Sequence, residues 1–358
     1  MDDTIKQINL EDFFRNPEYS SFQLSPNGEY ISYMKPWEDG NRMMNVYIKK
    51  IGSKNEIRLT KASKRSLYGY FWLSNDRIAY AQDKGGDENI HIYAVNIDGS
   101  NDIDLTPYEN VQARIIDDLE DSPNFMMISL NKRDARIHDV YRLDVNNGKI
   151  ELIAENPGNI MSWMTDNKGS LRVALTTDGV NSSLLYREDE FQEFKSILTT
   201  NFKESVSPLY FTFDNQELYV SSNRGRDKSA IFKFDLNNGQ EKELIFEHDE
   251  VDVYGLMRSK KRKIITGVSY TTDKRQIEFF DSWRENIQNK LESKLGNVEV
   301  SVVDFNKDER TIKIQTNDFD DFDKYLANNS FIGEFVNLVN TIDWPTRVGP
   351  KLCTRGCT

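Results

Sequence analysis

One short pattern of apolar, aromatic and polar positions recurs along the chain. An apolar residue is followed by an aromatic residue, any residue, a second apolar residue and then Asp or Asn, as in residues 92–96, 140–144 and 231–235. Successive aromatics at or near this position are 46, 48, 45, 46, 47 and 46 residues apart. They are Tyr47, Tyr93, Tyr141, Tyr186, Phe232, Phe279 and Tyr325. Such a regular interval indicates a repeated structural unit built from short strands.

Polar turns between two apolar strands recur at about the same interval, roughly 20 residues before each aromatic. They lie at residues 25–28, 74–76, 121–124, 166–169, 214–215, 259–261 and 306–308. Further turns follow the aromatic strands, as at Asp98-Gly99 and Asn146-Asn147-Gly148. Asn-Gly and Asp-Gly are strong hairpin signals because a type I′ turn needs positive φ at both central residues. Each repeat therefore predicts about four antiparallel strands.

This period and strand content are typical of a β-propeller blade. We therefore predict an all-β fold, a seven-bladed β-propeller with four-stranded, WD40-like blades over residues 20–326. Residues 1–19 are expected to lead into the propeller, and residues 327–358 to form an atypical C-terminal tail. Both cysteines, Cys353 and Cys357, lie in this tail. The tail is either a truncated or frame-shifted end, which we favour, or a genuine one.

Residues 282–296 interrupt the repeat and predict one short helical insertion in the sixth blade. Ser282-Trp283-Arg284-Glu285 has the form of a capping box, and Gly296 is suited to end a helix. Ile287, Leu291 and Leu295 recur between them at four-residue spacing. We expect an amphipathic helix that packs on the outer strands of its blade, with partner docking as the alternative.

Composition narrows the class of protein further. The chain contains 10 Ala and 33 Asn, which argues against a helical bundle. Its formal net charge of −12 argues against nucleic acid or an anionic membrane as the main partner. No apolar run reaches the length of a membrane span, and no signal peptide is visible, so we expect a cytoplasmic protein.

Four segments resemble a known family. Residues 25–31, Ser-Pro-Asn-Gly-Glu-Tyr-Ile, look like the blade motif shared by TolB-type propellers and by the propellers of prolyl-oligopeptidase-family (S9) serine peptidases. Residues 10–18, 83–89 and 270–274 resemble segments of the S9 propellers. The chain thus resembles the propeller of the acylaminoacyl-peptidase and dipeptidyl-peptidase branch over about residues 8 to 326.

The resemblance implies a propeller that caps a separate α/β-hydrolase domain with a Ser-His-Asp triad and admits small peptides. The nearest string to a nucleophile elbow, residues 267–271, lacks the closing Gly of G-x-S-x-G. We therefore expect no catalytic residue here, and a non-catalytic substrate-gating domain whose partner is a peptide substrate or a hydrolase domain. The alternative is a stand-alone TolB-like propeller that binds proteins or peptides. An enzyme with its site in the central channel, such as a glycosidase, is disfavoured.

Loops between the second and third strands of the blades are the candidate binding surface, since loops on a rigid scaffold carry function. The candidate residues in these loops are Trp37, Asp83, Asp87, Glu88, Arg224, Arg226, Asp273 and Lys274. Arg224 and Arg226 are the strongest candidates for an anion or carboxylate contact. For each residue, a plain loop role is the alternative.

No cofactor or metal is expected. Cys353 and Cys357 lack further Cys or His partners nearby in sequence, and zinc needs about four ligands. The acidic run Asp318, Asp320, Asp321 and Asp323 lacks the spacing of an EF-hand.

Overall fold

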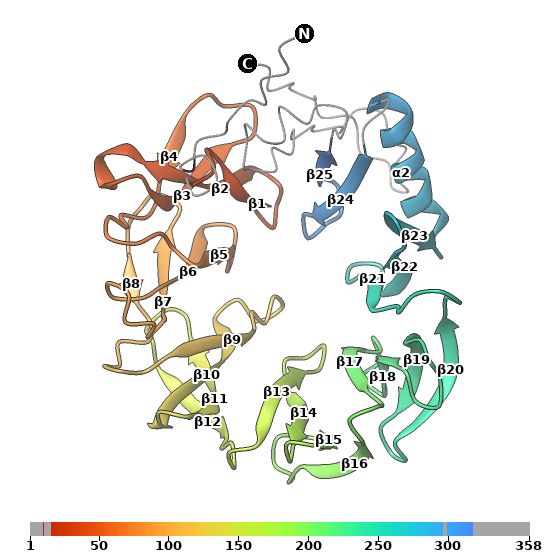
Figure 1. The fold of residues 1–358 in the computed structure, drawn as a ribbon. Coiled ribbons are helices and arrows are strands. Elements are labelled where there is room, and N and C mark those ends of the chain that lie inside the picture. The colour runs from red at the N-terminus through yellow and green to blue at the C-terminus, as the bar shows by residue number, and fades with distance from the viewer. Residues whose placement is uncertain (1–9, 11–15, 296–298, 318–358) are drawn as a thin grey trace. The chain divides into compact units, whose positions relative to one another are not determined.

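The computed structural model describes residues 10, 16–295 and 299–317. Within this part, nearly all regular structure is short antiparallel strands, β1 to β25, with one longer helix, α2 (Figure 1). The chain divides into two compact units. Unit 1 contains residues up to 104 together with those from 286 onward, and unit 2 contains residues 105–285.

Unit 1 contains two four-stranded sheets and a two-stranded hairpin. The first sheet is β1 (Ser20–Leu24), β2 (Tyr30–Trp37), β3 (Met43–Lys50) and β4 (Glu56–Arg58), with a 3-10 turn, η1 (Glu38–Gly40), after β2. The second sheet is β5 (Gly69–Trp72), β6 (Arg77–Gln82), β7 (His91–Asn96) and β8 (Ile103–Asp104). The hairpin is β24 (Glu299–Phe305) and β25 (Ile312–Asn317).

The sheets of unit 1 pack face to face because alternate residues of each strand are apolar. Val46 and Ile48 of β3 and Ile78 of β6 are fully buried in one core cluster. Tyr70 and Trp72 of the second sheet reach into the first. The Tyr70 hydroxyl and the Trp72 indole N–H lie 3.0 Å and 2.9 Å from Ser32 Oγ.

Unit 2 contains three four-stranded sheets and one three-stranded sheet. The first is β9 (Ala113–Asp117), β10 (Phe125–Asp134), β11 (Ile137–Asp144) and β12 (Ile150–Ala154). The second is β13 (Ile160–Thr165), β14 (Leu171–Thr177), β15 (Ser182–Tyr186) and β16 (Lys195–Thr200). The third is β17 (Val206–Phe211), β18 (Glu217–Ser222), β19 (Ala230–Asp235) and β20 (Gln240–Phe246). The three-stranded sheet is β21 (Gly255–Ser259), β22 (Ile264–Thr271) and β23 (Arg275–Phe279).

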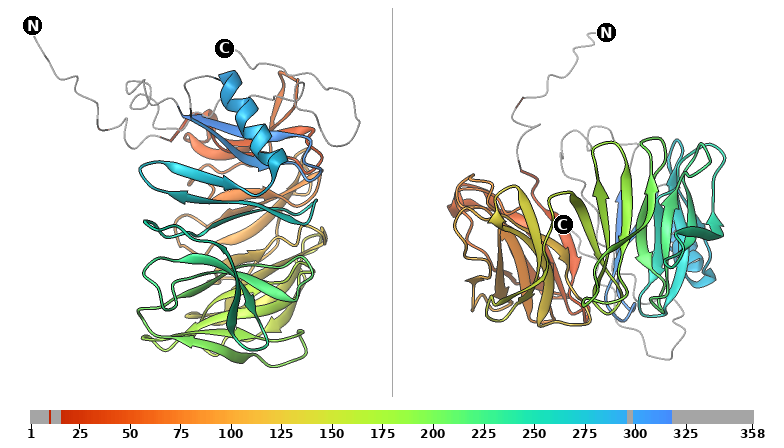
Figure 2. Two further views of the ribbon diagram at one scale, coloured as in Figure 1. Left: turned by 90° about the vertical axis from the view of Figure 1, so that its right-hand side faces the viewer. Right: turned by 90° about the horizontal axis from the view of Figure 1, so that it is seen from below.

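Neighbouring sheets of unit 2 also stack face to face, as the green strands in Figure 2 show. Val173 of β14 and Leu184 of β15 join Phe211, Leu218 and Phe234 of the next sheet in one buried cluster. A four-stranded sheet cannot bury both faces by itself, so this stacking supplies the core.

The predicted repeat lies in the expected register. Six of its aromatics, Tyr47 to Phe279, occupy the third strands β3, β7, β11, β15, β19 and β23. Each of the seven polar turns joins the first strand of its repeat to the second. The seventh aromatic, Tyr325, lies outside the described residues, as do the predicted tail, its cysteines and the acidic run from Asp318.

The prediction of seven four-stranded blades is wrong. The described residues form six blades, of which five have four strands and the sixth, β21–β23, has three. The predicted helix accounts for the missing strand, since α2 (Ser282–Leu295) follows β23 directly in the chain. The seventh repeat contributes only the hairpin β24–β25 in the described part. This hairpin lies beside β1, where the Lys307 N–H donates to Pro26 O at 2.9 Å.

Candidate functional site

A cavity of about 540 Å³ lies at one end of the sixth blade, within unit 2. Its walls come from the β18–β19 loop, the β20–β21 linker and the adjoining ends of β21, β22 and β23. The side chains that matter for its chemistry are Lys228, Glu250, Asp252, Tyr254, Tyr270 and Arg275. Its size is within the range of small-ligand sites.

Buried hydrogen bonds hold the linker wall of the cavity in place. Ser229 is 2% exposed, and its N–H donates to Asp252 Oδ1 at 2.7 Å. Its hydroxyl lies 3.2 Å from the hydroxyl of Tyr254, whose ring is half exposed to solvent. The Tyr270 ring, also in the lining, contacts Phe246 and His248 with centroids 5.6 Å and 4.7 Å apart. Both aromatic side chains of the cavity are thus held by neighbours.

The charged side chains of the cavity differ in how far they are already paired. Lys228 Nζ lies 3.2 Å from the carboxylate of Asp227, next to it in sequence. Among the residues that the structure describes, the Arg275 guanidinium and the Glu250 carboxylate have neither an ion pair nor a hydrogen bond. Arg275 is therefore the cation most available to a ligand.

Arg224 and Arg226, the strongest candidates from sequence, are engaged within their own blade. Arg226 lies over the Phe232 ring at 4.3 Å. Its two terminal nitrogens lie 3.4 Å and 3.5 Å from the carboxylates of Glu247 and Glu241. Arg224 Nη1 donates to Gly239 O at 3.4 Å. Neither residue lines the cavity.

Asp273 and Lys274 form the exposed tip of the β22–β23 hairpin, directly before the cavity residue Arg275. Thr272 Oγ1 donates to Asp273 Oδ1 at 3.0 Å, and the Thr272 N–H donates to Lys274 O at 3.0 Å. These contacts give the hairpin its shape. Among the loops predicted from the sequence as binding loops, this hairpin lies closest to the cavity.

The other four candidates belong to unit 1, where they shape loops. Trp37 ends β2, and the Arg58 guanidinium lies 3.7 Å from its ring centroid. Asp83 is buried and accepts hydrogen bonds from the Tyr68 hydroxyl at 3.3 Å and the Glu88 N–H at 3.4 Å. Glu88 itself has a positive φ of 60°. The β6–β7 loop is thus built around Asp83.

Asp87 completes the same loop by accepting the backbone N–H groups of Lys84 and Asn89, each at 3.2 Å. Partial desolvation works to raise the pKa of Asp87, but the hydrogen bonds from Asn89 and Lys84 outweigh it and hold the pKa below its ordinary value. Asp83, Asp87 and Glu88 therefore act together in loop structure.

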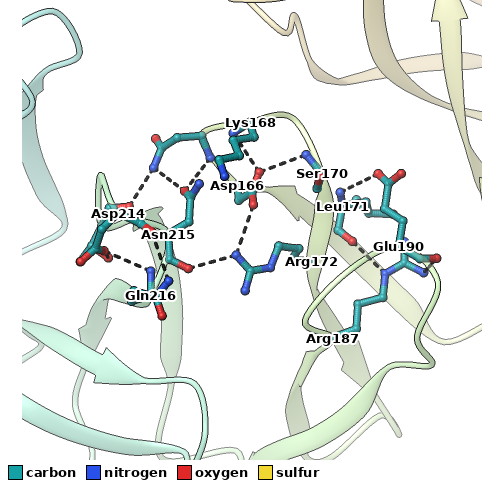
Figure 3. A network of polar contacts seen from close by, with 12 residues as sticks. Asp166, Lys168, Ser170, Leu171, Arg172, Arg187, Glu190, Asp214, Asn215 and Gln216 are labelled. Atoms are coloured by element: carbon teal, nitrogen blue, oxygen red, sulfur yellow. Dashed lines mark hydrogen bonds and ion pairs between the residues drawn. The ribbon is translucent and has the colours of Figure 1, made fainter.

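A buried polar network lies between the fourth and fifth blades of unit 2 (Figure 3). The Arg172 and Asp166 side chains, 10% and 6% exposed, form an ion pair at 3.2 Å. Arg172 also donates to Asn215 O at 3.0 Å. Asp166 accepts the N–H groups of Lys168 and Ser170 at 2.9 Å and 3.1 Å. Because this ion pair and its hydrogen bonds tie a buried side chain of one blade to the backbone of the next, we regard the network as structural.

Ser269, in the string nearest to a nucleophile elbow, lies inside β22 and lines the cavity. A nucleophile elbow instead requires a sharp turn from a strand into a helix. In the described structure Ser269 has no hydrogen bond to a histidine, and the nearby His248 accepts the Glu250 N–H through Nδ1 at 3.1 Å. The geometry at Ser269 is that of a strand residue.

Sequence reasoning missed Lys228, Glu250, Asp252, Tyr254, Tyr270 and Arg275 as a group. They come from two successive blades and the linker between them, so no short motif contains them. The one available signal was the position of Lys228 and Arg275 next to the two predicted loops of the fifth and sixth blades.

Comparison with known proteins gives two curated relatives, while no family model matches the chain. The chain is 31% identical over 267 residues to dipeptidyl aminopeptidase BIII of Pseudoxanthomonas mexicana, covering 72% of this chain and 37% of that protein. It is 23% identical over 289 residues to dipeptidyl peptidase family member 6 of Caenorhabditis elegans, covering 75% and 38%. The chain thus spans little more than a third of the length of these relatives.

Solved structures extend the likeness to the fold. A prolyl endopeptidase structure matches with a TM-score of 0.58 at 12% identity, over 86% of this chain and 48% of that chain. This match shows the β-propeller fold. The described residues of this chain contain no α/β-hydrolase domain. The chain is therefore a homologue of the dipeptidyl peptidases and prolyl oligopeptidases of the S9 peptidase family, and it matches their β-propeller part.

Proposed function

We propose that this chain is the non-catalytic, substrate-gating propeller domain of an S9-type serine peptidase. Peptide hydrolysis is the task of an α/β-hydrolase domain with which the propeller works. The observation that carries the proposal is the 31% identity to a dipeptidyl aminopeptidase over 72% of this chain but only 37% of the relative. The cavity at the loop end of the sixth blade supports it, because it offers a peptide both charged and aromatic contacts.

One feature of the sequence supports a non-catalytic role for this chain. The sequence contains no G-x-S-x-G string, and the nearest approach to one lies in β22. No helix in the described part of the chain is long and apolar enough to cross a membrane. The family likeness points to a peptide substrate and a hydrolase domain as the partners in this proposal.

A chimera tests the gating role. This chain replaces the matching segment of dipeptidyl aminopeptidase BIII, and hydrolysis of a dipeptidyl anilide and of a folded protein is measured. We expect hydrolysis of the anilide only. The matched control is the same relative with its propeller segment deleted, in which discrimination between the two substrates should be lost. A folded chimera that cleaves both substrates equally, or neither, would contradict the proposal.

A further inference from the structure

Arg275 differs from the other arginines at this end of the fifth and sixth blades. Arg224 and Arg226 are committed to Gly239 O and to two glutamates. Arg275 is exposed and lines the cavity, and its guanidinium has no ion pair or hydrogen bond within the described residues. A guanidinium presents a planar fork of N–H donors that matches a carboxylate in a bidentate manner. The carboxylate contact that the sequence placed at Arg224 and Arg226 therefore fits Arg275 better.

The acidic residues of the cavity decide which anion suits it. Asp252 is held by the Ser229 N–H, whereas the Glu250 carboxylate has no partner within the described residues. Two cations, Arg275 and the Asp227-paired Lys228, thus line one cavity together with two carboxylates. Because like charges repel, this balance disfavours a phosphate dianion and tolerates a single carboxylate.

The aromatic residues indicate what the carboxylate is attached to. Tyr254 is 53% exposed although its hydroxyl is held by Ser229, so a large part of its ring faces solvent. Tyr270, which also lines the cavity, is held by Phe246 and His248. Such fixed rings supply contact area for an apolar side chain at little entropic cost. A short peptide offers both an apolar side chain and a terminal carboxylate.

We propose that this cavity binds the C-terminal end of short peptides. Arg275 receives the terminal carboxylate, and Tyr254 and Tyr270 contact the side chain of the last residue. The inference rests on the proposed function and deepens it, since it gives the propeller a preference for peptides with a free C-terminus.

Calorimetric titration of the purified 358-residue chain tests the site. The probes are acetyl-Ala-Ala-Phe with a free carboxylate and the same peptide as its C-terminal amide. We expect the acid to bind at least about tenfold more tightly than the amide, a difference of about 1.4 kcal/mol. Arg275→Gln should weaken binding of the acid by a similar factor, while Arg275→Lys should retain part of it because the charge remains without the fork.

Lys274→Gln is the matched control. It removes one positive charge from the adjacent exposed residue, which does not line the cavity, and should change the affinity by less than about twofold. The proposal is overturned if the acid does not bind, if acid and amide bind equally, or if Lys274→Gln weakens binding as much as Arg275→Gln. Displacement of the acid by inorganic phosphate at equal concentration would also contradict it.

The outcome is separable from that of the proposed function. Titration uses this chain alone and needs no hydrolase domain, whereas the chimera reports gating by cleavage. Binding that depends on Arg275 together with an ungated chimera would support the cavity and reject gating. A gated chimera with no difference between acid and amide would reject the cavity and leave gating intact.

Discussion

At the scale of single residues, turn glycines fix the hairpins of the repeat. Gly239, in the turn after β19, has a φ of 68°. A Cβ at this position would lie 2.1 Å from Ile197 O of the neighbouring blade, also in unit 2. Gly225 has a similar φ of 64°, but a Cβ there would have nothing within 4 Å. Substitutions at these two glycines therefore distinguish the cost of backbone strain from the cost of steric overlap.

Gly239→Ala should be much more destabilising than Gly225→Ala. The left-handed conformation costs a residue with a Cβ about 1–2 kcal/mol, and this is the expected loss at Gly225. At Gly239, overlap with Ile197 O should add about 1–3 kcal/mol. Urea unfolding of both variants measures the difference, and equal losses would contradict this account of the blade contact.

His138 in β11 provides a residue-scale test by pH. Burial, followed by the charge of Arg114, lowers its pKa below the ordinary value of 6.5, and its Nε2 has no hydrogen-bond partner in the described structure. The unfolded chain therefore takes up a proton first as pH falls. The stability linked to neutral His138 is fully present above about pH 6.5 and is lost as pH falls towards the lower, folded-state pKa.

The wild-type chain should thus lose more stability than His138→Gln when the pH falls from about 7.5 to about 5.5. Urea unfolding at both pH values measures the two losses, and the difference between the proteins isolates this one group. Identical losses would show that the pKa of His138 is the same in the folded and unfolded chains.

At the scale of elements, the sequence predicts what is local to a strand or a turn. The aromatics at Tyr47 and Phe232 lie in third strands, and the turn at residues 166–169 joins β13 to β14, as expected. Turn residues and the alternation of apolar and polar positions act over only a few residues, so both can be recognised in the sequence. The role of Arg172 could not be recognised from the sequence, because its partners lie in a turn and in the next blade.

Arg172→Met should destabilise unit 2 by about 3–5 kcal/mol, because it leaves the buried Asp166 carboxylate without its cation. Arg136→Met is the matched control, since Arg136 is 84% exposed and pairs with Asp134 at 2.8 Å. Loss of that exposed pair should cost far less, because solvent screens it. Urea unfolding compares them, and an equally small loss at Arg172 would mean that the network does not stabilise the blade junction.

At the scale of the whole molecule, the repeat predicts the class of fold but not the number of blades. Seven repeats are visible in the sequence, yet the described residues form six blades, because α2 follows β23 and the last described repeat contributes only β24 and β25. The outer strand of a blade buries few side chains, so its sequence pattern is weak. A helix can therefore take its place. The cavity was equally invisible, because Lys228, Asp252 and Arg275 belong to three different segments.

We propose that this propeller serves a peptidase whose hydrolase domain is encoded with it. The decisive measurement is to sequence the transcript that carries this reading frame and to translate the downstream region in every frame. We expect an α/β-hydrolase sequence with G-x-S-x-G, followed by Asp and then His. An unrelated coding sequence downstream would contradict it.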